Sequence, residues 1–153
     1  MSDIRQILVP VDFSEHSREA LDYAAELARP FGASLDVLHV WEAPAFVPPA
    51  SLPDAGVADL SLVELVKANA ERSLDEFVTA ATKRGVKVRR AEVQPGTPAH
   101  SIVDFAKSGG YDLIVIGTHG RTGIARAVIG SVAERVVRHA PCAVLTVRPP
   151  AAK

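Results

Sequence analysis

The sequence predicts an α/β fold in which a single open, doubly wound sheet of five parallel strands carries helices on both faces. Short apolar runs rich in β-branched residues alternate along the whole chain with stretches of helical periodicity. Strands that are separated by helices run parallel in one sheet and are joined by right-handed crossovers. The length of 153 residues suits one core, so we expect residues 1–153 to form a single domain.

The first part of the chain predicts a strand, a helix and a second strand. Residues 7–11 form an apolar run that is interrupted by Pro10, as in a buried strand followed by a turn. Ser14 is a typical helix N-cap, and the helix that follows it is expected to end near Gly32. Residues 35–41 predict the second strand.

The middle of the chain predicts a loop, a long helix and a third strand. Residues 43–57 contain four prolines and predict a long exposed loop. Asp59 is expected to cap a helix that ends at Gly85, because apolar residues keep helical spacing between the two. Residues 87–93 alternate polar and apolar side chains, as a strand with one solvated side would.

The last part of the chain begins with a clear helix signal at Gly96-Thr97-Pro98. Thr97 is the expected N-cap and Pro98 the first helical residue, and the helix is expected to end at about Ser108. Residues 113–116 are almost purely apolar and predict a central strand. The remaining predicted elements are a helix over residues 131–139 and a strand over residues 143–147.

A glycine-rich stretch runs from Gly117, at the end of the predicted central strand, to Ser131, at the start of the predicted helix. Its glycines would let the backbone approach a phosphate closely and adopt positive φ. The first N–H groups of a helix lack internal partners and attract anions. Ser131 could cap the helix and donate its hydroxyl to phosphate, with Arg121 and Arg126 nearby for charge-assisted contacts. We therefore expect Gly130→Val to abolish nucleotide binding and leave the fold intact.

The alternative is that these glycines only build turns. Four glycines and Ser131, placed between a strand end and a helix start, favour phosphate binding over that alternative. The stretch lacks Gly-Lys-[Ser/Thr], so it is not a P-loop, and it is not a Gly-x-Gly-x-x-Gly dinucleotide loop.

The pattern Gly117-x2-Gly120-x9-Gly130-Ser131 resembles the ATP-binding motif of the universal stress protein (UspA-like) family. Residues 7–14 resemble the opening strand and turn of that family, and Leu38-His39-Val40 resembles its second strand. The resemblance also includes the segments Gly96-Thr97-Pro98, 130–136 and 140–145. It covers nearly the whole chain and implies the family's Rossmann-like, adenine nucleotide α-hydrolase-like fold and its ATP-binding subclass.

The resemblance also implies the residues of a nucleotide site. Asp12 would hydrogen-bond the ribose, with Pro10 and Val11 lining the site near adenine and ribose. Val40 would contact the adenine ring, and Gly117 would lie close to the ribose and phosphates. The other residues expected in the site, most of them around the phosphates, are Ile116, His119, Gly120, Arg121, Gly130, Ser131 and Val132.

Three further residues each have a plain interpretation beside a functional one. His119 could act as a general base, although a histidine next to glycine is more often an exposed loop residue. His39 is expected to be packed in the core. Cys142 is expected to be a small buried hydrophobe rather than a redox sensor.

The function implied is that of an ATP-binding regulator in the stress response, with Mg²⁺ accompanying the nucleotide. A slow Mg²⁺-dependent ATPase is an alternative, but the loop offers no lysine and no clear water-activating carboxylate, so hydrolysis would be weak. A nucleotide-independent interaction module is the other alternative. The residues do not separate ATP from ADP, AMP or a cyclic nucleotide.

The net charge and the composition limit the kinds of partner that we expect. With 17 basic and 18 acidic residues the net charge is -1, which gives no electrostatic case for nucleic acid or for an anionic membrane, and we expect neither as a partner. For the same reason we set aside the match of Gly120-Arg121-Thr122-Gly123 to the loop of KH RNA-binding domains. The single cysteine and the polar residues 1–6 give no sign of secretion. We expect a cytoplasmic protein.

A homodimer is the expected assembly. The strand over residues 143–147 would be an apolar sheet edge, and such an edge invites pairing with another chain. The resemblance implies that this strand pairs antiparallel with its mate across a two-fold axis.

Overall fold

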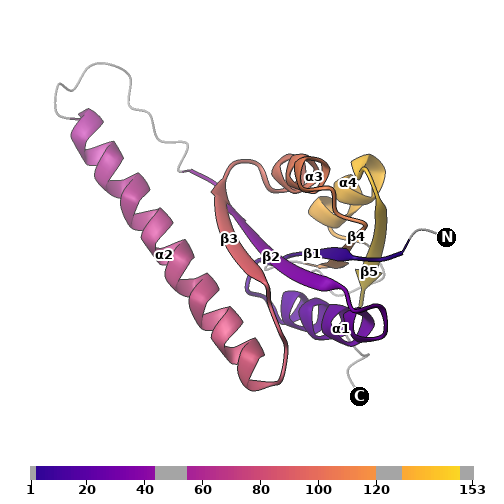
Figure 1. Cartoon of the computed structure of the whole chain (residues 1–153). Helices are drawn as coiled ribbons and strands as arrows, with labels where there is room; N and C mark the ends of the chain where they lie inside the picture. Colours follow the sequence, from indigo (N-terminus) through magenta and orange to yellow (C-terminus); the bar gives the residue numbers. More distant parts are fainter. Residues whose placement is uncertain (1–2, 44–54, 120–128, 149–153) are drawn as a thin grey trace.

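The computed structural model describes residues 3–43, 55–119 and 129–148, with the backbone alone for residues 55–61. Strands and helices alternate along the chain (Figure 1). The elements are β1 (Gln6–Pro10), α1 (Glu15–Phe31), β2 (Ser34–Trp41), α2 (Ala55–Lys83), β3 (Arg90–Pro95), α3 (Pro98–Gly109), β4 (Leu113–Gly117), α4 (Ser131–His139) and β5 (Ala143–Val147).

The five strands form one parallel sheet with the order β3-β2-β1-β4-β5. The strands β2 and β3 lie on one side of β1, and β4 and β5 lie on its other side. The order therefore reverses between β1 and β4. In open α/β sheets of this kind, ligands bind beyond the carboxyl ends of the strands at the reversal. The fold class predicted from the sequence is confirmed.

Helices cover both faces of the sheet (Figure 1). The helices α1 and α2 pack on one face, over a core that includes Ile7, Val9 and Val115. The helices α3 and α4 pack on the other face, over Leu8 and Ile114. Alternate residues of β1 and β4 thus point into opposite cores, as the two-residue period of a strand requires.

The ends of α1 follow the local signals in the sequence. The Ser14 hydroxyl accepts a hydrogen bond from the Ser17 N–H at 3.2 Å, and Gly32 ends the helix in the left-handed conformation with φ of 62°. A Cβ is disfavoured in that conformation, which explains the glycine. These two residues fix the length of the helix that leads away from the carboxyl end of β1.

Two predicted boundaries differ from the structure. Residues 87–93 were expected to form the third strand, but β3 spans Arg90–Pro95. Val86 is buried and Val88 is half-buried beneath α1 and α2, so their alternation reflects packing of the connection after α2 rather than a strand. The Arg89 N–H already donates to the Leu35 carbonyl, directly before the strand.

The second difference concerns the start of α2. The helix begins at Ala55, four residues before the expected cap at Asp59, so the end of the expected loop over 43–57 is helical. Residues 44–54 of that loop lie outside the part of the chain that the structure describes. The N-terminal part of α2 projects beyond the sheet (Figure 1).

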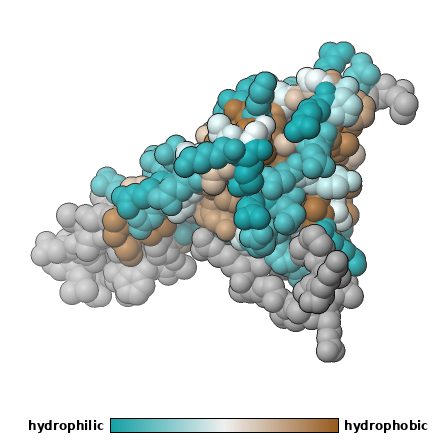
Figure 2. All heavy atoms as spheres, turned by 90° about the horizontal axis from the view of Figure 1, so that it is seen from below, coloured by the Kyte–Doolittle hydropathy of each residue, from teal (hydrophilic) through white to brown (hydrophobic). Residues whose placement is uncertain are grey.

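Hydrophilic residues dominate the face of the molecule shown in Figure 2, and smaller hydrophobic areas lie among them, one on the projecting helix. Leu62 and Leu65 are exposed apolar residues of that helix. Over the described residues, no helix combines the length and the apolar character that a bilayer span needs.

Candidate functional site

A cavity of about 720 Å³ opens at the carboxyl ends of β1, β2 and β4, at the reversal of strand order. The first turn of α4 and one side of α2 and α3 complete its walls. Ten of the predicted site residues line it: Pro10, Val11, Asp12, Val40, Ile116, Gly117, His119, Gly130, Ser131 and Val132. Gly120 and Arg121, which were also predicted, lie outside the described residues, as does Arg126.

Several cavity residues were not predicted. Trp41 and Glu42 follow Val40 at the end of β2, while Asn69 and Ser73 reach the cavity from α2. The position of Trp41 and Glu42 at a strand's carboxyl end was a usable signal. No local signal marks Asn69, because only tertiary packing brings α2 to this edge of the sheet.

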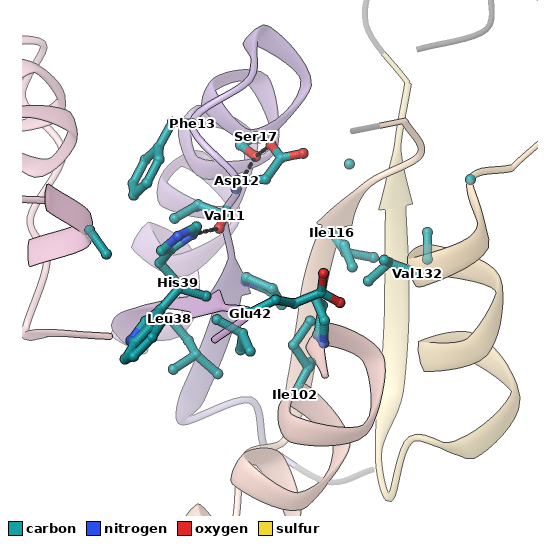
Figure 3. Close-up of a pocket in the computed structure, with 18 of the residues that line it drawn as sticks. Val11, Asp12, Phe13, Ser17, Leu38, His39, Glu42, Ile102, Ile116 and Val132 are labelled. Carbon is teal, nitrogen blue, oxygen red and sulfur yellow. Dashed lines mark hydrogen bonds between the residues drawn. The ribbon is translucent and has the colours of Figure 1, made fainter. Parts of the chain in front are cut away.

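Asp12 is tied to the first turn of α1. Its Oδ1 atom accepts hydrogen bonds from the Ser14 N–H at 3.0 Å and from the Ser17 hydroxyl at 2.5 Å (Figure 3). The Asp12 N–H in turn donates to the Ser17 hydroxyl oxygen at 2.9 Å. This small network holds the carboxylate at the mouth of the cavity, where it can meet a ligand hydroxyl in a fixed position.

The residue after Asp12 has a strained backbone. Phe13 adopts φ of 67°, a region that bulky side chains rarely occupy and that costs about 1–3 kcal/mol. Its ring lies 4.2 Å from the His39 ring and 5.7 Å from the Phe77 ring, centroid to centroid. His39 Nδ1 donates to the Val11 carbonyl at 2.8 Å (Figure 3). His39 is therefore a cavity residue that positions the β1 turn, rather than the core histidine that was expected.

The two described loop glycines are required by close backbone packing. A Cβ atom on Gly117 would lie 2.9 Å from the His16 carbonyl oxygen, and one on Gly130 would lie 2.9 Å from the Thr118 carbonyl oxygen. Positive φ was the expected reason, but neither residue adopts it, and Gly130 has φ of -64°. The β4 end thus packs directly on α1 and on the start of α4.

The start of α4 faces the cavity. Gly130, not Ser131, is the N-cap, and no side chain makes the cap hydrogen bond, so the expected cap role of Ser131 is wrong. The Glu134 N–H closes the first turn on the Gly130 carbonyl at 2.9 Å. The N–H groups of Ser131, Val132 and Ala133 have no carbonyl partner earlier in the helix. These three residues line the cavity and form a positive dipole end that attracts anions.

His119 lies in the cavity wall and is half-buried, so the expectation of an exposed loop histidine is wrong. Its Nδ1 is 2.9 Å from the Thr118 hydroxyl, and its ring centroid is 5.3 Å from that of His16. Its Nε2 atom is buried and makes no hydrogen bond within the structure described. A buried polar atom without a partner carries a desolvation cost that a ligand could remove.

Known proteins share this fold and this sequence pattern. The sequence model of the universal stress protein family matches residues 3–148. The chain belongs to the universal stress protein family. Universal stress protein MJ0531 of Methanocaldococcus jannaschii is 39% identical over 146 residues, which cover 95% of this chain and 83% of the relative.

Solved structures of the universal stress protein family agree. The UspA protein of Lactobacillus plantarum has a TM-score of 0.71 and 30% identity, covering 97% of this chain and 100% of the other. A universal stress protein from Archaeoglobus fulgidus, solved in complex with dAMP, has a TM-score of 0.63 and 26% identity over 95% of this chain and 98% of the other. A universal stress protein solved in complex with cAMP has a TM-score of 0.66 and 26% identity over the same shares.

Proposed function

We propose that this universal stress protein binds ATP, or a close adenine nucleotide, and acts as a nucleotide-dependent regulator in the stress response. The observation that carries the proposal is the convergence of three features on one cavity. They are the α4 N-terminus, the strained turn after β1 and the reversal of strand order. A cavity of about 720 Å³ is within the usual range of small-molecule sites.

The phosphates would lie at the start of α4. The N–H groups of Ser131 and Val132 and the Ser131 hydroxyl are the donors there. The unpartnered Nε2 of His119 fits the same role when the Thr118 hydroxyl donates to Nδ1, since Nε2 then carries the hydrogen. We infer that these groups hold phosphate oxygens. Gly120 and Arg121 stay predicted phosphate contacts on the strength of the sequence motif alone.

The ribose and base would lie toward β1 and β2. The Asp12 carboxylate, fixed by Ser17, would accept a hydrogen bond from a ribose hydroxyl. Val40 and Ile102 offer apolar surface to the base from β2 and α3. Mg²⁺ would be held largely by phosphate oxygens and water, as it commonly is at nucleotide sites. The described residues include no cluster of three or more His, Cys, Asp or Glu side chains that could hold a metal.

The relatives solved with dAMP and cAMP support an adenine nucleotide as the ligand class. Both ligands carry one phosphate. We propose a triphosphate rather than a monophosphate because of the motif from Gly117 to Ser131 and the donors at the α4 N-terminus.

A fluorescence titration tests the proposal. Trp41 is the single tryptophan of the chain and lines the cavity, so its emission should change saturably when ATP enters. Ser131→Ala removes one hydroxyl from an exposed residue and should weaken ATP binding by about tenfold without changing the unfolding curve. Absence of any saturable change for the folded wild-type protein, repeated by equilibrium dialysis, would overturn the proposal.

We further propose that two copies pair through β5. This strand lies at the edge of the sheet and is half-buried along most of its length. An unpaired strand edge of this kind favours association with a second strand. If the two strands pair antiparallel, the nucleotide sites of the two copies would lie at opposite strand ends of one continuous sheet.

A further inference from the structure

Glu42 stands out among the cavity residues because it brings a carboxylate to a wall that is otherwise apolar. It follows β2 directly, two residues after Val40 and four after Leu38. Leu38 and Val40 are buried against α3 and α4. Figure 3 shows the Glu42 side chain extending into the cavity, toward the side where Ile102, Ile116 and Val132 lie.

The Glu42 carboxylate has no partner among the residues that the structure describes. It forms neither a hydrogen bond nor an ion pair there, whereas Asp12 in the same cavity is bound by Ser17. No lysine or arginine is among the described residues that line the cavity. A carboxylate accepts hydrogen bonds and donates none, so a ligand that approaches it must offer a donor.

The position of Glu42 also restricts how a nucleotide lies. The phosphates are drawn to the start of α4, and like charge keeps them from a carboxylate. The flat base is then left for the apolar surface of Val40 and Ile102, beside Glu42. At position 6 a 6-aminopurine carries an exocyclic N–H donor, whereas a 6-oxopurine carries an acceptor at that position and has its N–H donor at the neighbouring N1.

We propose that the Glu42 carboxylate accepts a hydrogen bond from the 6-amino group of the base and thereby selects 6-aminopurines over 6-oxopurines. This inference rests on the proposed nucleotide-binding function and names its specificity-determining residue. Glu42 is exposed in the free protein, and a bound base would displace water from its carboxylate. An analogue that lacks the 6-amino group would then leave the carboxylate without a partner, and the site would reject it. The 6-oxo oxygen of a 6-oxopurine would also face the Glu42 carboxylate, and the two hydrogen-bond acceptors would repel each other.

The test compares three nucleotides on three proteins, and on one control variant, by equilibrium titration with Mg²⁺. The nucleotides are ATP, purine riboside triphosphate, which has hydrogen in place of the 6-amino group, and inosine triphosphate, which has the 6-oxo group. The proteins are the wild type, Glu42→Ala and Glu42→Gln. Wild-type protein should prefer ATP to purine riboside triphosphate by about tenfold, and Glu42→Ala should bind the two equally.

The ratio of the two affinities isolates the hydrogen bond. Removing a negative charge affects every triphosphate alike, so its effect cancels in the ratio. Glu42→Gln keeps an acceptor and gains an N–H donor, so it should bind inosine triphosphate about tenfold better, relative to ATP, than the wild type does. Glu26→Ala, a change at an exposed residue of α1 that does not line the cavity, should leave all ratios unchanged.

The possible failures are distinguishable. A wild-type protein that binds none of the three nucleotides would overturn the proposed function, and this inference with it. A wild-type protein that binds ATP, but whose preference over purine riboside triphosphate survives in Glu42→Ala, would overturn this inference alone. An unchanged preference against inosine triphosphate in Glu42→Gln would count against it in the same way.

Discussion

At the scale of single residues, Gly130 joins the start of α4 to the backbone directly after β4. Its N–H donates to the Thr118 carbonyl, and the same carbonyl oxygen would be 2.9 Å from an added Cβ. A glycine at position 130 therefore allows the close approach of the start of α4 to Thr118, with or without a ligand. The expectation that Gly130→Val leaves the fold intact does not hold, because the side chain meets protein backbone and not only phosphate.

Gly130→Ala should accordingly affect both stability and binding. The new Cβ would be too close to the Thr118 carbonyl oxygen, so either the start of α4 or the end of β4 must move. This movement should lower the free energy of unfolding by about 1–3 kcal/mol. ATP affinity should fall with it, since the α4 donors move. Urea unfolding and ATP titration of the same preparation measure both effects, and Ser131→Ala is the control that should change binding alone. Wild-type stability together with wild-type affinity in Gly130→Ala would contradict this account of the loop.

A second residue-scale feature is a polar cluster around the buried Asp36, at the amino ends of the strands and on the opposite edge from the cavity. Asp36 is 2% exposed, and both of its carboxylate oxygens accept hydrogen bonds from Arg89. The Tyr111 hydroxyl donates to Asp36 Oδ2 at 2.7 Å. Burial alone would raise the pKa of Asp36, but the bonds from Arg89 and Tyr111 outweigh it and hold that pKa below its ordinary value.

Tyr111→Phe should destabilise the fold by about 1.5–3 kcal/mol, the usual range for a hydrogen bond to a charged group. Urea unfolding measures the loss, and Tyr23→Phe, at the half-exposed second tyrosine of the chain, is the matched control that should cost little. Equal losses in the two variants would show that the bond to Asp36 contributes nothing.

The same tyrosine predicts a pH dependence. Burial, followed by the hydrogen bond to Asp36 and its charge, raises the pKa of Tyr111 to about 12. The folded state then holds the phenol proton more tightly than the unfolded state, whose tyrosine pKa is about 10. This contribution to stability is fully present below pH of about 10 and is lost as the pH rises toward about 12. The difference in stability between wild type and Tyr111→Phe should therefore shrink across that window, and a constant difference would contradict the assignment.

At the scale of elements, β5 presents a defined set of backbone groups to its free edge. The Thr118 N–H donates to the Val147 carbonyl, so the peptide groups of Val147 face β4. Because these groups alternate along a strand, those of Leu145 also face β4, and those of Val144 and Thr146 face away from it. The edge that would meet a second copy is therefore specified by Val144 and Thr146.

Val144→Pro should weaken the proposed dimer by about tenfold or more, because proline removes an outward N–H that a second strand would use. The bonds from β5 to β4 do not use that group, so the monomer should stay folded. Leu145→Pro is the contrasting variant, since it removes an N–H that faces β4 and should disrupt the strand itself. Sedimentation equilibrium together with circular dichroism separates the two effects. A dimer of unchanged affinity in Val144→Pro would exclude β5 as the interface.

The elements also show what the sequence could and could not predict. The strands at 7–11, 113–116 and 143–147 and the helix after Ser14 were predicted nearly to the residue, because their signals are local: apolar runs, an N-cap and a terminal glycine. The third strand was placed three residues early, since Val86 and Val88 are apolar for reasons of tertiary packing. No local pattern distinguishes that packing from a strand.

The site residues also divide into those with a signal in the sequence and those that depend on tertiary packing. The ten predicted residues that line the cavity follow a motif or a strand end, both visible in the sequence. Trp41 and Glu42 were missed although they too lie at a strand end, whereas Asn69 and Ser73 of α2 were missed because their part in the cavity depends on how α2 packs. The role of Gly130 was also misjudged, since its constraint comes from Thr118, twelve residues earlier in the chain and in contact only in the fold.

At the scale of the whole molecule, the sheet brings chemically different ends of its elements to one place. The start of α4 offers N–H groups that have no partner within the helix, and the turn after β1 holds a fixed carboxylate at Asp12. Apolar surface comes from β2 and α3. Each contribution is small by itself. Their arrangement in one cavity matches a ligand that is anionic at one end, hydroxylated in the middle and flat at the other.

Binding of an adenine nucleotide in this cavity can be measured by calorimetric titration. Protein stripped of nucleotide by unfolding and refolding would be titrated with ATP and Mg²⁺, with AMP and with GTP. We expect saturable binding of one ATP per chain, with GTP bound at least about tenfold more weakly. Refolded protein that releases or absorbs no binding heat with any of these nucleotides, at several temperatures, would contradict it. The glycine-rich stretch would then be a structural turn only.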